Sequence, residues 1–355
     1  MQLSENPAMV YCQGAYNTPN GKTAHGLVRF TNRYKVTGVI DARYANRDAG
    51  EVIDGKPRQI PVFGSLEEAL RNLPQRPTHF VIGIAPDGGR LSAEARNDVI
   101  EAIKNGLHIH AGLHDFLSED RELNRLAEQY GGELKDIRKP PDRKYLHFFS
   151  GKIEEVKALK VAVLGTDSAV GKRTTAWKLV QALTGSGIRS EMIGTGQTAW
   201  LQGAQYSIVM DSLVNDFVSG ELEHAVWQAW EKERPEVIII EGQGSLLNPA
   251  YPGGYEILAA TRPDLVILQH APFRSDYDGF PGYPIHPLPK QIEAIEMISG
   301  KPVVALTINH EEMIEDEVKQ YVAFIGRTLG LPAFDVLLHG AEGLAETIRK
   351  HLKPV

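Results

Sequence analysis

The sequence contains very little cysteine, since Cys12 is the only one among 355 residues. A single thiol excludes an intrachain disulfide and any zinc site built from several cysteines, and it is typical of proteins from a reducing compartment. No apolar stretch approaches the ~20 residues that span a bilayer, and residues 1–7 lack the basic and apolar regions of a signal peptide. We therefore expect a cytoplasmic protein that is neither secreted nor inserted in a membrane.

Positive charge is also scarce. Lys and Arg number 38 against 45 Asp and Glu, which gives a net charge of −7, and no block of basic residues stands out. A surface for nucleic acid or for an anionic membrane is therefore not expected. We expect small-molecule substrates instead, and a homo-oligomeric assembly. The length corresponds to about two domains of ~150 residues, each large enough for its own core.

Short β-branched apolar runs alternate with amphipathic helical patterns along the chain, which is typical of parallel sheets covered by helices. Strands are predicted at 36–41, 79–84, 107–111, 161–164, 237–240, 265–268 and 303–307. The segment 138–143 is polar and rich in proline, and it indicates a domain boundary. We therefore predict an α/β protein with two domains, residues 1–145 and residues 146–355.

The strongest chemical signal is a glycine loop between the predicted strand 161–164 and a helical segment. The loop and the start of the helix comprise Gly165, Thr166, Asp167, Ser168, Ala169, Val170, Gly171, Lys172, Arg173, Thr174 and Thr175. In such a loop the backbone N–H groups surround an oxyanion, the helix N-terminus adds partial positive charge, and the lysine reaches the outer phosphates. These residues are predicted to bind a diphosphate-containing cofactor. The structural alternative is a glycine-rich turn with a surface lysine.

This loop departs from the usual phosphate loop in two ways. Five residues separate Gly165 from Gly171 where four are usual, a spacing that resembles dethiobiotin synthetase and its relatives. Arg173 also stands where a serine or threonine normally binds Mg²⁺, so Thr174 would have to replace that hydroxyl from a different angle. The pattern favours binding of a diphosphate over its metal-dependent cleavage, and we predict no metal ligand.

Acidic and polar residues follow other predicted strands of the second domain. Glu241 directly follows the buried strand 237–240, where phosphate-loop folds place a carboxylate that binds Mg²⁺ or acts as a base. A strand-capping turn residue is the alternative. Gln197 follows another expected strand and offers an amide at the same edge of the sheet. Asp211 is either an active-site carboxylate or a helix-entry residue.

The segment 269–280 follows the strand 265–268 and is rich in His, Arg and aromatic residues. Arg274 offers a planar fork for a carboxylate, and His270 has an ordinary pKa near neutrality that suits proton transfer. A purely structural loop is the alternative. We predict catalytic roles for two residues and substrate binding for three others. The former are Glu241 and His270, and the latter are Arg274, Gln197 and Asp211.

Two further patterns carry weaker chemical signals. His108 and His110 alternate along a predicted strand and His114 follows it, which suggests a metal site, but Asp115 is the only nearby carboxylate. Packed or hydrogen-bonded histidines are therefore the preferred interpretation. The stretch 14–23 ends in Gly-Lys-Thr and looks like a second phosphate loop. It lacks a good preceding strand, so we do not expect it to bind phosphate.

Taken together, these motifs resemble the DgcN family, proteins with a P-loop that were long described as a domain of unknown function and are associated with D-glutamate N-acetylation. Matching stretches lie in order along both domains, at 83–89, 112–117, 165–175, 195–198, 216–220, 241–246 and 270–274. The resemblance implies a Rossmann-like domain over 1–145 and a dethiobiotin-synthetase-like P-loop domain over 146–355. It also implies transfer of acetyl from acetyl-CoA to the amine of D-glutamate or a related D-amino acid.

Two other functions stay open. In an ATP- and Mg²⁺-dependent ligase or kinase resembling dethiobiotin synthetase, Lys172, Thr174 and Glu241 would organise Mg-ATP. A nucleotide-binding regulatory protein without catalysis is the third hypothesis. Arg173 favours acetyl transfer weakly, because the loop can hold the diphosphate of CoA without cleaving it.

Overall fold

The computed structural model describes residues 6–352 and contains two compact α/β units. The first unit comprises the chain up to Pro140 together with Gln197–Gly203, and the second comprises Pro141–Gly196 and the chain from Ala204 onward. The predicted boundary after residue 145 lies a few residues beyond the one observed. The return of Gln197–Gly203 to the first unit was not expected from any pattern in the sequence.

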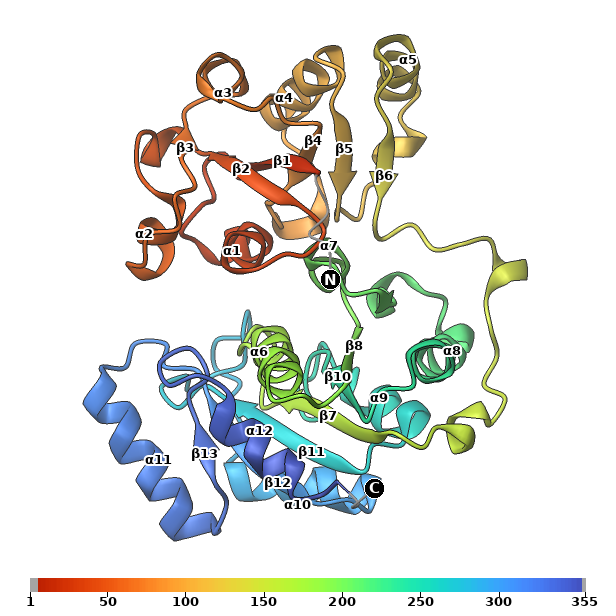
Figure 1. Ribbon diagram of the computed structural model, residues 1–355, viewed down its shortest axis with the longest axis vertical. Helices are drawn as coiled ribbons and strands as arrows, with labels where there is room; N and C mark the ends of the chain where they lie inside the picture. Colours follow the sequence, from red (N-terminus) through yellow and green to blue (C-terminus); the bar gives the residue numbers. More distant parts are fainter. Residues whose placement is uncertain (1–5, 353–355) are drawn as a thin grey trace. The chain divides into compact units, whose positions relative to one another are not determined.

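The sheet of the first unit is parallel, with strand order β3-β2-β1-β4-β5-β6 (Figure 1). Its strands are β1 (Pro7–Tyr11), β2 (Lys35–Ile40), β3 (Val62–Phe63), β4 (His79–Ile82), β5 (His108–Ala111) and β6 (Leu134–Asp136). This is the strand order of the Rossmann fold, so the fold implied for this half of the chain is confirmed. The central strand β1 was not predicted, because Pro-Ala-Met-Val-Tyr is short and contains little β-branched sequence.

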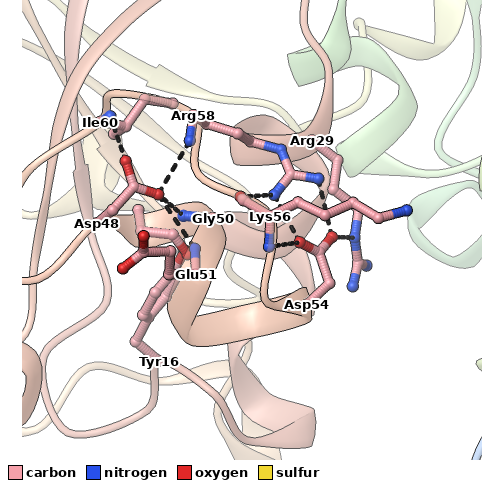
Figure 2. Close-up of polar contacts among 10 residues, drawn as sticks. Tyr16, Arg29, Asp48, Gly50, Glu51, Asp54, Lys56, Arg58 and Ile60 are labelled. Carbon is pink, nitrogen blue, oxygen red and sulfur yellow. Dashed lines mark hydrogen bonds and ion pairs between the residues drawn. The ribbon is translucent and has the colours of Figure 1, made fainter.

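The helices of the first unit are α1 (Lys22–Arg29), α2 (Ala49–Asp54), α3 (Leu66–Asn72), α4 (Ala93–Lys104), α5 (Arg121–Tyr130) and α7 (Gln197–Gln202). Figure 2 shows how two carboxylates secure α2 and the loop that follows it. Asp48 caps the helix by accepting hydrogen bonds from the N–H groups of Gly50 and Glu51. Asp54 at the other end pairs with Arg29 and Arg58.

The second unit also has a parallel sheet, with strand order β13-β12-β11-β7-β10-β8-β9 (Figure 1). Its strands are β7 (Leu159–Gly165), β8 (Ser190–Gly194), β9 (Tyr206–Ser207), β10 (Val237–Glu241), β11 (Leu265–His270), β12 (Val303–Ile308) and β13 (Ala333–Phe334). Its helices are α6 (Lys172–Gly185), α8 (Asn215–Glu233), α9 (Gly254–Thr261), α10 (Leu288–Ser299), α11 (Glu315–Leu329) and α12 (Glu342–Arg349). Over residues 6–352, no helix is both long and apolar enough to cross a bilayer.

The order of the central strands positions the candidate site. Strand β7 lies between β10 and β11, and all three are buried almost throughout. In the parallel register Glu241 pairs with Val163, and Gln269 pairs with Gly165. The carboxyl ends of the three strands therefore meet at one edge of the sheet, where open α/β folds bind their ligands.

Candidate active site

The glycine loop leads from the end of β7 into the first turn of α6. Its second glycine, Gly171, has a φ of 108°, which side chains rarely adopt. The stem of Lys172 passes close to two other glycines. A Cβ on Gly165 would lie 2.9 Å from Lys172 Cδ, and a Cβ on Gly242 would lie 3.0 Å from it. Lys172 is only 7% exposed, so the alternative of a turn with a surface lysine is wrong.

Lys172 and Glu241 are buried charges that influence each other. Burial lowers the pKa of Lys172 to about 8, although the carboxylates of Glu241 and Asp167 favour the charged ammonium. Burial raises the pKa of Glu241, while the positive charges of Arg173 and Lys172 oppose that shift. A carboxylate with a raised pKa holds a proton more readily than an ordinary one, which suits proton transfer.

The backbone beside β10 orients the Glu241 carboxyl group. The N–H of Thr195, which follows β8, donates to Glu241 Oε2 over 2.9 Å. The Thr195 hydroxyl donates to the backbone oxygen of Glu241 over 3.2 Å. Thr195 is fully buried, so the turn after β8 holds this carboxyl group in one position. Glu241 itself is 5% exposed and lies at the strand end where it was expected.

His270 is the last residue of β11, and its ring Nδ1 lies 3.0 Å from the hydroxyl oxygen of Thr166 in the glycine loop. Burial and the positive charge of Arg274 lower the pKa of His270 to about 4. The imidazole is therefore neutral near pH 7 and is a weak proton acceptor there. Its ring instead connects the end of β11 to the loop.

Asp167 is the central acceptor of the loop region. Its side chain is completely buried and receives hydrogen bonds on both oxygens. Oδ1 accepts from Asn248 Nδ2 (2.9 Å) and from the N–H of Ser168 (2.7 Å). Oδ2 accepts from Arg274 Nη1 (3.0 Å) and from the N–H of Asp278 (2.8 Å). One buried carboxylate thereby joins the glycine loop to the loops that follow β10 and β11, with the partners that a buried charge requires.

Arg274 uses both of its terminal nitrogens within the protein. Nη1 also donates to the backbone oxygen of Ser168 over 2.8 Å, and Nη2 pairs with Glu311 Oε2 over 2.6 Å. The side chain of Arg274 is 16% exposed, against 48% for that of Glu311. The sequence predicted that Arg274 binds a carboxylate of the substrate, and its contacts with Asp167 and Glu311 were not anticipated. Its role toward a substrate stays a prediction.

Gln269 is a buried residue that sequence reasoning missed. Its side-chain oxygen accepts hydrogen bonds from the hydroxyl groups of Thr175 in α6 and Thr307 in β12. Its amide nitrogen lies 3.6 Å from the position that a Cβ on Gly171 would take. Asn248 was also missed, because it belongs to no local motif. Gln269 lies next to the end of β11, which is the signal that could have identified it, whereas Asn248 lies in the loop well beyond β10 and offers no such signal.

Gln197 and Asp211 are located differently from the residues above. Gln197 is the first residue of α7, which belongs to the first unit, where a Cβ on Gly112 would lie 2.6 Å from Gln197 Cγ. Asp211 is the exposed residue of a 3-10 turn, Met210–Ser212, and accepts a hydrogen bond from the hydroxyl of Ser212. Substrate binding by these two residues stays a prediction.

The histidine row does not converge as a group of three. His108 and His110 lie beside His79 of β4, with ring centroids 5.1 and 4.9 Å from its own, while His114 lies beyond the end of β5. His110 Nδ1 is hydrogen-bonded to the hydroxyl of Tyr34, and burial lowers the pKa of His110 to about 3. Among the residues described, none of the His, Cys, Asp and Glu clusters has a metal-binding arrangement. Ring packing accounts for His108, and ring packing together with a hydrogen bond accounts for His110.

The stretch 14–23 follows β1, so the expectation that no strand precedes it was wrong. The polar backbone groups around it are nevertheless occupied by the protein. At the start of α1, the N–H of Ala24 donates to the oxygen of Gly83, and the oxygen of Asn20 accepts from the N–H of Ala85. The loop also donates through the N–H of Tyr16 to Asp41. The N–H groups of Tyr16 and Ala24 are thereby used within the protein, and N–H donors are the groups that a phosphate would need.

Comparisons with known proteins agree with this architecture. Residues 147–345 match a family described as the P-loop domain DUF1611_C, and residues 42–140 match the Rossmann-like domain DUF1611_N, both of unknown function. The chain is 28% identical over 275 residues to a D-glutamate N-acetyltransferase of Tritonibacter scottomollicae, and 30% identical over 276 residues to one of a Pseudoalteromonas species. Each match covers 76% of this chain and 80% of the relative.

A solved structure extends the likeness to nearly the whole chain. The crystal structure of a DUF1611 family protein from Anabaena variabilis superposes with a TM-score of 0.90 at 29% identity. The match covers 98% of this chain and 100% of the other. The resemblance seen in the sequence motifs is thereby confirmed for both domains.

Proposed function

This chain belongs to the DUF1611 family, and from that premise we propose that it transfers an acetyl group from acetyl-CoA to the amine of D-glutamate or a related D-amino acid. Two relatives whose matches cover about three-quarters of this chain are named D-glutamate N-acetyltransferases. The structural observation that carries the proposal is the glycine loop, in which a buried Lys172 lies within the electrostatic influence of Glu241 and Arg173.

The loop would hold the diphosphate of CoA. Its backbone N–H groups and the start of α6 favour an anion, and Lys172 and Arg173 supply two positive charges at that point. Positive side chains can neutralise a diphosphate that is bound but not cleaved. The residue after the lysine can then be an arginine instead of a serine or threonine, because no Mg²⁺ has to be positioned for phosphoryl transfer.

The chemistry requires a base and a stable position for the acceptor amine. The ammonium of an amino acid must lose a proton before its nitrogen can attack the thioester carbonyl carbon. The new C–N bond forms, the C–S bond breaks, and the CoA thiolate leaves and takes up a proton. Glu241 is the better candidate for the base, since its pKa is raised whereas that of His270 is lowered to about 4.

The proposal is tested by incubating the purified protein with acetyl-CoA and a panel of D- and L-amino acids in the presence of a chelator of divalent cations. Release of the CoA thiol and formation of N-acetyl-D-glutamate, detected by mass spectrometry, are expected without added metal. Parallel reactions contain ATP and Mg²⁺ in place of acetyl-CoA and the chelator. Formation of ADP in these reactions, with no thiol release from acetyl-CoA, would contradict the proposal and favour the ligase or kinase hypothesis.

A further inference from the structure

The guanidinium group of Arg274 has an inner and an outer half. Its inner nitrogen, Nη1, contacts Asp167 Oδ2 and the backbone oxygen of Ser168. The Asp167 carboxylate is completely buried and has three other donors, so this half of the arginine is fixed. The outer nitrogen, Nη2, contacts the carboxylate of Glu311.

Glu311 is far more exposed than Asp167, so a ligand can replace it more easily as a partner of Arg274. It lies on the loop after β12, and its side chain is 48% exposed. An ion pair at such a position contributes little to stability, because water and salt screen it and the flexible side chain loses entropy when it is held. The inner pair is thus buried and supported by other bonds, whereas the outer pair can open without breaking those bonds.

We propose that Glu311 is an internal stand-in for a carboxylate of the acceptor substrate, which displaces Glu311 from Arg274 Nη2 when it binds. The inference rests on the proposed function, because it assigns a carboxylate-bearing amine as the acceptor. An arginine that is oriented by a buried carboxylate, and whose other nitrogen contacts the half-exposed carboxylate of Glu311, is prepared to receive a carboxylate in its place. The group that now holds that nitrogen is itself the carboxylate of a glutamate side chain, the same chemical group that D-glutamate carries.

Glu311 and a carboxylate ligand would compete for the same nitrogen of Arg274. Removing the charge of Glu311 should therefore strengthen ligand binding. Glu311→Gln removes the charge that competes for Arg274 and should tighten the binding of a carboxylate. An exposed ion pair contributes at most about 1 kcal/mol, so the affinity should rise by a factor of about two to five. If Glu311 instead served to position Arg274, the same substitution would weaken binding.

The experiment measures the affinity for glutarate, a dicarboxylate without an amine, by calorimetric titration of the full-length protein. Glutarate cannot be acetylated, so the result does not depend on whether the protein is an acetyltransferase. We expect glutarate to bind two to five times more tightly to Glu311→Gln than to the wild type, and Arg274→Lys to lose most of the binding. Glu312→Gln serves as the matched control, because it removes the same charge from the next exposed residue of the same loop.

Kinetics provide a second measurement. If acetyl transfer to D-glutamate is observed, Glu311→Gln should lower the Michaelis constant for D-glutamate by the same factor and leave that for acetyl-CoA unchanged. Equal or weaker glutarate binding in Glu311→Gln, an equal gain in Glu312→Gln, or no binding by either the wild type or Glu311→Gln would overturn the proposal. A tighter complex with glutarate in a protein that does not acetylate D-glutamate would instead contradict the proposed function and leave the stand-in supported.

Discussion

The ammonium group of Lys172 donates a hydrogen bond to the backbone oxygen of Asp167, 2.7 Å away, within the same glycine loop. The hydrogen-bond acceptor of the Lys172 ammonium is therefore an uncharged backbone oxygen of the loop. A phosphate oxygen is a stronger acceptor for an ammonium because it carries charge. A ligand with a diphosphate can accordingly take the place of the Asp167 oxygen, and the consequences can be measured.

We expect Lys172→Ala to weaken the binding of CoA by about 1.5–3 kcal/mol, the range for a hydrogen bond to a charged group, which corresponds to about a 10- to 150-fold rise in Kd. Calorimetric titration measures this change directly. Lys178→Ala, on the exposed side of the same helix, provides the control and should bind CoA like the wild type. An unchanged Kd in Lys172→Ala would remove the loop from the mechanism.

The binding of CoA should depend on pH through Lys172. Because burial lowers its pKa from 10.5 to about 8, the group loses its proton as the pH rises through about 8, well below the usual range. A diphosphate favours the charged ammonium, so the affinity should be highest below pH 8 and fall above it, by up to about tenfold per pH unit. Titrations from pH 6.5 to 9.5 test this, and the slope should disappear in Lys172→Ala. The same slope in both proteins would assign the pH dependence to another group.

Glu241→Gln should reduce acetyl transfer by about 10²- to 10⁴-fold, the contribution typical of a general base, and should abolish the acidic limb of the pH profile of kcat. The amide is close in shape to the carboxylate, so the fold should persist, and a thermal unfolding curve checks this. His270→Asn is the comparison, with a smaller loss expected because the pKa of His270 lies far below neutrality. If His270→Asn removed the acidic limb and Glu241→Gln did not, the assignment of the base would be reversed.

Asp167→Asn tests the buried junction of the three loops. The amide keeps one oxygen but has no charge to offset that of Arg274. If that oxygen stays beside Arg274, the NH₂ group faces the N–H donors of Asn248 and Ser168. Removal of one partner from a buried ion pair costs about 3–5 kcal/mol, so the free energy of unfolding in urea should fall by that order. Asp142→Asn, an exposed position in the second unit, should unfold like the wild type. A loss below about 0.5 kcal/mol in Asp167→Asn would show that the junction contributes little to stability.

Much of the candidate site could be predicted from local sequence. Strands β7, β10 and β11 are continuous apolar runs, as expected for strands buried on both faces of a parallel sheet. Each run ends at or beside a residue with a chemical function, and the carboxyl ends of parallel strands share one edge. The proximity of the glycine loop, Glu241 and His270 could therefore be expected from the sequence.

Short elements were harder to predict, because two or three residues cannot show a periodic pattern. Strands β3, β9 and β13 contain two residues each, and they form only because longer neighbours offer free backbone groups. The helix α7 was missed for a related reason. Six residues form it in the first unit through contacts made by side chains far apart in the sequence, such as the hydrogen bond between Thr23 and Thr198.

The sequence by itself determined the order of strand, loop and helix around the phosphate loop, because burial of apolar runs and the geometry of glycine act over a few neighbouring residues. Only the tertiary structure decided the partners of Asp167 and Arg274. Their contacts join residues 81 and 107 positions apart, and no local pattern specifies which charge meets which. Hydrogen bonding of a buried carboxylate is a property of the packed fold, since the donors come together only when the loops of three strands converge.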